Sequence, residues 1–119
     1  MALTDTARAE LRRLLAEDRD RTAEQLASLE RTFAELVAAA DLEPPDDEHD
    51  PDGTTAYERA QVTSLAAEAR VRLAALDESL ATDEATLGTC TACNEPIPWE
   101  RLEAVPGTRA CITCAAAGA

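Results

Sequence analysis

The chain has 119 residues and a formal net charge of −13 at pH 7, from 24 acidic residues against 11 basic ones, all of which are Arg. Phosphate backbones repel a chain this acidic, which argues against a general nucleic-acid-binding protein. No apolar run approaches the roughly 18 residues that span a bilayer. The N-terminus also lacks a basic stretch followed by an apolar one. We therefore expect a cytoplasmic protein that makes no membrane contact.

The apolar residues are those of helices. Ala occurs 26 times and Leu 14 times, whereas Phe, Trp, Tyr and Met occur once each. Sheets are rich in β-branched and aromatic side chains, and long helices in Ala, Leu, Glu and Arg. The composition therefore predicts a mainly α fold.

The first expected helix begins near residue 4, where Thr4 or Asp5 can cap the first amide groups. Apolar residues then recur at alternating spacings of three and four, as on one face of a helix. The two rows of this stripe are Leu15, Thr22, Leu29 and Leu36, and Leu26, Phe33 and Ala40. Polar residues fall on or beside the stripe at Asp18 and Arg21, and Leu11 continues it toward the N-terminus.

Residues 41–53 form an acidic, proline-rich connector. They carry seven acids and no base, so they hold −7 of the net charge of −13. Pro44, Pro45 and Pro51 remove backbone donors and exclude a helix interior. On composition alone, this charge cluster can be simply a solvated turn.

A second helix is expected after Gly53, because Thr54 or Thr55 can cap it. Its apolar stripe follows spacings of 4, 3, 4, 3 and 4, through Val62, Ala66, Ala69, Leu73, Leu76 and Leu80, with Leu65 beside it. Two narrow seams joined by a proline-rich loop predict an antiparallel coiled-coil hairpin over residues 1–82, with its tip at 41–53. Helices of roughly 30–35 residues would make it about 45–50 Å long.

All four cysteines lie in residues 83–119, a segment expected to form a small zinc finger at the base of the hairpin. They form two C-x-x-C pairs, Cys90 with Cys93 and Cys111 with Cys114, separated by 17 residues. This spacing is typical of a tetrahedral zinc site in which four thiolates leave no open position, so we expect one structural zinc per chain. Iron bound by four thiolates is a chemical alternative. Disulfides are disfavoured inside the cell, and a dithiol-exchange enzyme would need a βαβ context that is absent.

Two further residues of this segment have expected roles. Asn94 follows the first pair and is the non-glycine residue type that best tolerates a left-handed conformation. Trp99, the only tryptophan, is expected to pack into the finger, which has few other large apolar side chains. The metal must then supply much of the folding energy.

The chain resembles the DksA/TraR family of bacterial transcription regulators. The finger carries the family's pattern as Cys90-Thr91-Ala92-Cys93-Asn94-Glu95-Pro96-Ile97-Pro98 and Cys111-Ile112-Thr113-Cys114-Ala115. The stretch 46–53, followed by Tyr57-Glu58-Arg59-Ala60, lies where that family has its coiled-coil tip. The resemblance implies a monomeric, non-enzymatic regulator that binds RNA polymerase through the secondary channel and places the tip near the active site.

The resemblance also assigns the tip residues. The family's tip motif is Asp-x-x-Asp-x-Ala, and Asp47, Asp50 and Asp52 fall at its three defined positions, with Asp52 in place of Ala. The chain has no Lys, so the basic residues that some members use to bind guanosine tetraphosphate are missing, and binding of that nucleotide is not carried over. Arg70, Arg72 and Arg109 are the available substitutes.

Three other functions compete with this interpretation. The hairpin could be an adaptor that binds another protein, with the zinc finger clamping its base. It could also assist transcript cleavage as Gre-type factors do, with its acidic tip helping to hold a catalytic magnesium ion. Those factors, however, lack a four-cysteine finger. Direct DNA binding ranks last, because residues 89–119 carry a charge of −1 and four thiolates with one zinc add a further −2.

Overall fold

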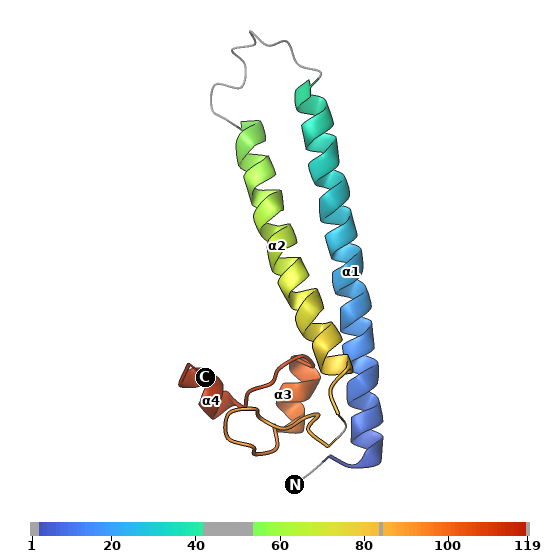
Figure 1. Cartoon of the computed structure of the whole chain (residues 1–119), viewed down its shortest axis with the longest axis vertical. Helices are drawn as coiled ribbons and strands as arrows, with labels where there is room; N and C mark the ends of the chain where they lie inside the picture. The colour runs from blue at the N-terminus through green and yellow to red at the C-terminus, as the bar shows by residue number, and fades with distance from the viewer. Residues whose placement is uncertain (1–2, 42–53, 84, 119) are drawn as a thin grey trace. The chain divides into compact units, whose positions relative to one another are not determined.

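The computed structural model describes residues 3–41, 54–83 and 85–118. They form the helices α1 (Asp5–Asp41), α2 (Thr54–Leu80), α3 (Trp99–Ala104) and α4 (Ile112–Ala116) (Figure 1). The described residues contain no strand, only an isolated antiparallel bridge between Thr89 and Pro96. The prediction of a mainly α fold with a long helix pair is therefore confirmed. Asp47, Asp50 and Asp52 lie outside the described residues.

The start of α1 follows the expected capping signal. The Thr4 hydroxyl oxygen accepts a hydrogen bond from the amide of Ala7 at 3.0 Å, which satisfies one of the free donors of the first turn of α1. α2 begins at Thr54, directly after the proline-rich connector. None of the helices of the described residues has a stretch long and apolar enough to cross a membrane.

The chain divides into two compact units. One is Arg21–Leu73, and the other combines Met1–Asp20 with Ala74–Ala119. Each long helix therefore contributes to both units. The expected division into a hairpin at 1–82 and a finger at 83–119 is a different one, because it follows the order of the elements along the chain. It stays a prediction.

In the unit Arg21–Leu73, α1 and α2 pair through a sparse seam. Arg70 of α2 reaches Glu30 of α1 at 3.1 Å. The buried seam residues are small: Thr22, Ala66 and Ala69. The large seam residue Phe33 remains 39% exposed, and a cavity of about 200 Å³ lies between the helices, lined in part by Leu29, Phe33, Val62 and Ala66. Since the side chains of α2 that line this space do not fill it, the apolar stripe of α1 is only partly covered here.

In the other unit, the N-terminal part of α1 pairs with the C-terminal part of α2 in antiparallel fashion. Arg19 contacts Asp77 at 2.8 Å. Arg12 donates to the carbonyl oxygens of Leu80 and Thr82 at 3.0 and 3.1 Å. The last carbonyls of a helix lack partners within the helix, so this guanidinium caps the C-terminal end of α2.

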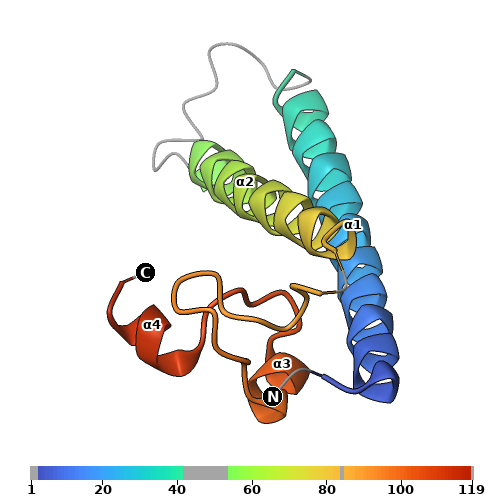
Figure 2. The same cartoon turned by 60° about the horizontal axis from the view of Figure 1, so that its bottom comes forward.

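One hydrophobic core holds this unit together. Its buried members are Leu11, Leu15, Leu76, Leu87, Cys90, Ile97 and Leu102. They come from α1, α2, α3 and the loops of the cysteine-bearing segment, and Trp99 packs against them, as expected. Both views show α3 beside the first turns of α1 (Figures 1 and 2). The cysteine-bearing segment and the helix ends therefore share a core.

Candidate metal centre

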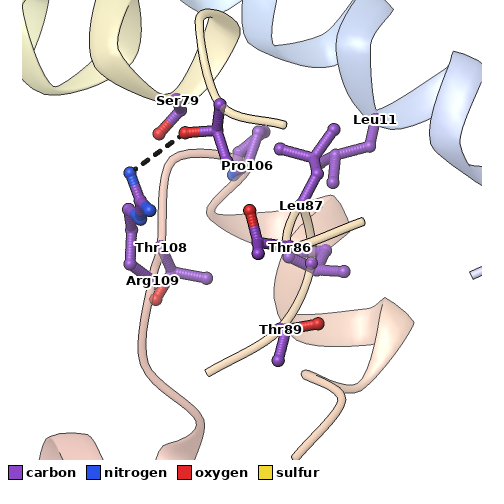
Figure 3. A pocket seen from close by; sticks show the side chains of 11 residues that line it. Leu11, Ser79, Thr86, Leu87, Thr89, Pro106, Thr108 and Arg109 are labelled. Atoms are coloured by element: carbon purple, nitrogen blue, oxygen red, sulfur yellow. Dashed lines mark hydrogen bonds between the residues drawn. The ribbon is translucent and has the colours of Figure 1, made fainter. Parts of the chain in front are cut away.

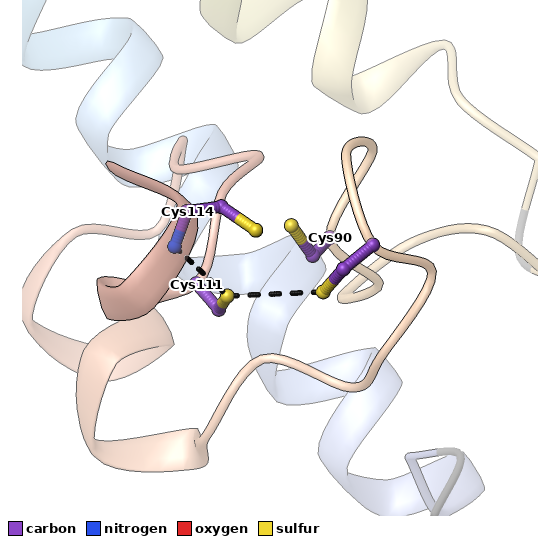
Figure 4. A group of neighbouring side chains, drawn as sticks. Cys90, Cys111 and Cys114 are labelled. Carbon is purple, nitrogen blue, oxygen red and sulfur yellow. Dashed lines mark hydrogen bonds between the residues drawn. The ribbon is translucent and has the colours of Figure 1, made fainter. Parts of the chain in front are cut away.

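The four cysteines converge on one point. Their Sγ atoms all lie within 4.8 Å of one another, and Sγ of Cys93 lies 3.9 Å from Sγ of Cys111 (Figure 4). A tetrahedral zinc with Zn–S bonds of about 2.3 Å requires sulfurs about 3.8 Å apart. The cluster is therefore close to the size that zinc needs.

The first cysteine pair lies on a tight loop closed by backbone hydrogen bonds. The amide of Cys90 donates to the carbonyl of Glu95 at 2.8 Å, and the amide of Asn94 donates to the carbonyl of Cys90 at 2.9 Å. Reversing the chain in so few residues requires a left-handed residue, and Asn94 supplies it with φ = 64°. The sequence-based expectation for Asn94 is thus confirmed.

The second cysteine pair opens α4. Cys111 is the N-cap of this helix, and its sulfur accepts a hydrogen bond from the amide of Cys114 at 3.4 Å. The two cysteine loops are tied together because the amide of Thr91 donates to the carbonyl of Arg109 at 2.9 Å. The guanidinium of Arg101 in α3 adds a bond to the carbonyl of Ala110 at 2.8 Å. Both pairs are therefore held in place by the backbone.

The four thiols have unequal surroundings. Backbone hydrogen bonds, first with Cys111 and then with Cys93, lower the pKa of the Cys90 thiol to about 6. Side-chain hydrogen bonding to Cys111, and then to Cys93 and Cys90, raises the pKa of the Cys114 thiol to about 12. Neighbouring thiols cannot all ionise without a cation to offset their charge. The cluster is thus suited to a divalent metal that neutralises several thiolates at once.

The donor set fits a structural zinc. Four sulfurs with no nitrogen or oxygen donor among them match a closed tetrahedral shell, and Cys90, Cys93, Cys111 and Cys114 are the residues that would hold the ion. When bound, the zinc supplies cross-linking of the two loops. Because four protein ligands would fill the coordination shell, no position is left open for a substrate. This agrees with the expected structural role of the zinc.

A small cavity lies in the same unit, and none of the four cysteines lines it. Its lining includes the hydroxyl residues Ser79, Thr86, Thr89 and Thr108, and its volume of about 10 Å³ is close to the minimum that one water requires (Figure 3). Arg109 borders it and donates to the hydroxyl of Thr82 at 3.3 Å. This cavity has no room for a nucleotide.

Sequence reasoning missed two features of this centre. It did not assign Cys90 to the hydrophobic core, and it did not foresee the capping role of Arg12. Cys90 is fully buried, whereas all residues from Thr91 to Glu95 are exposed. This difference in burial is visible only in the folded chain. The strict C-x-x-C spacing gives the ligand set but says nothing of which sulfur faces the core.

The comparisons with known proteins agree with this geometry. Residues 85–117 match the family model described as the prokaryotic dksA/traR C4-type zinc finger. The structure of transcription factor DksA2 from Pseudomonas aeruginosa is similar with a TM-score of 0.73 and 27% sequence identity, covering 96% of this chain and 84% of that one. No curated protein matches the sequence. The zinc-finger match and the cysteine cluster together support one structural zinc.

Proposed function

We propose that this chain, a member of the DksA/TraR family, is a transcription regulator that binds RNA polymerase through the secondary channel and presents its acidic loop near the active site. The observation that carries the proposal is the likeness to transcription factor DksA2, which extends over 96% of the chain and so includes the helix pair as well as the finger. A shared zinc finger alone would support much less.

The acidic loop is the part proposed to act. α1 ends at Asp41 and α2 begins at Thr54, so the loop joins these two helix ends. It holds Asp47, Asp50 and Asp52, the residues at the family's tip positions. Carboxylates brought into a confined, water-poor site attract basic side chains or the shell of a magnesium ion. The third carboxylate, Asp52, is expected to strengthen that attraction.

The chain is proposed to regulate without catalysing a reaction and without contacting DNA. Its net charge of −13 opposes binding to phosphate backbones. Guanosine tetraphosphate is not part of the proposal. Two of the arginines that could replace the missing lysines already have partners: Arg70 pairs with Glu30, and Arg109 lies 3.9 Å from Glu78.

The proposal is tested with purified bacterial RNA polymerase and three zinc-loaded forms of the chain. They are the wild type, a tip variant with Asp47→Asn and Asp50→Asn, and a control with Glu24→Gln and Glu35→Gln. The control loses the same charge from exposed positions of α1. We expect all three to bind polymerase, and only the tip variant to lose its effect on the lifetime of promoter complexes.

Two results would contradict the proposal. If the wild type has no affinity for polymerase, an adaptor role with another protein becomes the better account. If the wild type stimulates transcript cleavage in a stalled elongation complex and the tip variant does not, the loop assists catalysis instead of regulating initiation.

A further inference from the structure

The four cysteine residues of the metal centre differ in how far they are exposed to solvent. Cys90 has a relative exposure of 0%, Cys111 and Cys114 are half-buried, and Cys93 is exposed. A closed four-thiolate shell is symmetric in its bonding to zinc, so any difference in the order in which the ligands detach must come from the protein around them.

Cys90 is the ligand that the fold holds most firmly. It belongs to the core together with Leu11 and Leu15 of α1 and Leu76 of α2. Its amide and its carbonyl are both hydrogen-bonded within the first loop. Moving its sulfur away from the metal would open packed apolar surface and break backbone bonds at the same time, so it requires a subglobal opening of the unit.

Cys93 is in the opposite situation. Its neighbours Thr91, Ala92, Asn94 and Glu95 are all exposed, so no bulky side chain of this loop covers it. Rotation of its side chain away from the metal leaves the core untouched. An incoming ligand can therefore reach the zinc on this side while Cys90, Cys111 and Cys114 still hold it.

We propose that the Cys93 side of the finger is a ligand-exchange site, where displacement of Cys93 by an external thiolate is the first step of zinc transfer. In this step the bond between zinc and Sγ of Cys93 breaks, and a bond between zinc and the incoming sulfur forms. The external thiol loses its proton to solvent when it ionises, and the released Cys93 thiolate takes up a proton from solvent. No electron is transferred, and the zinc would have four sulfur ligands before and after the exchange.

The first test labels the zinc-loaded wild type with a brief pulse of N-ethylmaleimide. Native mass spectrometry then reports zinc content, and fragment ions report the labelled cysteine. We expect the first modified species to retain zinc and to carry at least about tenfold more label on Cys93 than on Cys90. Labelling of all four cysteines at once in zinc-free chains, or labelling of Cys111 or Cys114 before Cys93, would overturn the proposal.

The second test measures zinc transfer to a chromophoric chelator in the presence of glutathione. Attack by a thiolate predicts a transfer rate that rises in proportion to the glutathione concentration. A rate that does not depend on glutathione would mean that zinc leaves only when the finger opens, and the proposal would be wrong. Neither test involves polymerase, so its failure is distinguishable from failure of the proposed regulatory function.

A charge variant tests whether the incoming thiol attacks on the Cys93 side, and it does so without removing a zinc ligand. Glu95 lies two residues from Cys93 and is exposed, so its carboxylate repels an anionic thiol such as glutathione. Glu95→Gln should raise the glutathione-dependent rate by about two- to threefold and leave the rate with cysteamine, whose thiolate form has no net charge, nearly unchanged. Glu24→Gln, which removes the same charge from α1, should change neither rate. Equal responses of the two variants would contradict attack at the Cys93 side.

Discussion

Cys90 and Leu15 are both completely buried, with relative exposures of 0%, and they belong to the same hydrophobic core. One is a proposed zinc ligand, and the other lies on α1, 75 residues earlier in the sequence. Packing therefore links the metal centre to the helix pair as part of a single unit. A substitution at either residue should therefore alter the packing around the other.

Removal of zinc should loosen the ends of the helices as well as the finger. When Cys90 is released, Leu11, Leu15 and Leu76 lose part of the surface they pack against. We expect hydrogen exchange of the backbone amides in residues 8–16 and 74–80 to speed up at least about tenfold after chelation, since protection tracks local opening. Faster exchange confined to residues 85–118 would show that the finger unfolds independently.

Truncation of Leu15 should destabilise the zinc-loaded chain strongly. Leu15→Ala leaves a cavity in a fully buried site, at a cost of about 2–5 kcal/mol in the free energy of unfolding. The matched control is Val71→Ala on α2, where the side chain is 71% exposed and the expected change is within about 0.5 kcal/mol. Urea unfolding of both variants gives the comparison, and equal midpoints would refute the proposed core.

A side chain at Gly88 should destabilise the chain. Its φ of +83° is costly for other residues, by about 1–2 kcal/mol, and an added Cβ would lie 2.7 Å from Cδ1 of Leu3. Leu3 can move, but the backbone cost remains, so Gly88→Ala should lower the urea midpoint. Gly107→Ala serves as the control, because its Cβ would meet only Leu76 at 3.1 Å and no positive φ is involved. A larger loss at Gly107 would contradict this account.

Zinc affinity should fall as the pH is lowered. The neighbouring Cys111 raises the pKa of Cys114 to about 12, so without metal this thiol is protonated throughout pH 6–8. Zinc must displace at least that proton, which makes the dissociation constant rise at least about tenfold for each unit of pH decrease. Competition with a chelator of known pH dependence measures this slope. A constant affinity from pH 8 to pH 6 would contradict it.

Features governed by local chemistry were predictable from the sequence. Thr4 caps α1 because a hydroxyl can reach the free amide of Ala7, and Asn94 adopts φ = 64° because the loop after Cys93 must reverse. The cysteine cluster follows from the spacing that zinc coordination demands. For Thr4 and Asn94 the determining contacts lie within a few residues of sequence, and for the cysteines the metal links two pairs 17 residues apart.

Features that depend on distant packing were not predictable. Periodicity placed Phe33 on the seam, yet it is 39% exposed because the residues of α2 opposite it are too small to cover it. The sequence alone gives no sign that Arg12 is more than a surface arginine. In the fold its guanidinium donates to the carbonyl of Leu80, 68 residues away, and so caps the C-terminal end of α2. A single sequence specifies which face of a helix is apolar, and the fold decides what that face meets.

Crosslinking to polymerase tests the central claim most directly. A photoreactive amino acid placed at His49, between the tip carboxylates, should crosslink in the zinc-loaded complex to polymerase segments that line the secondary channel. The same group at Thr113, an exposed residue of α4, should not reach the channel interior. If position 49 crosslinks only to the outer surface of polymerase, or to no polymerase subunit, the loop does not enter the channel and the proposed function is wrong.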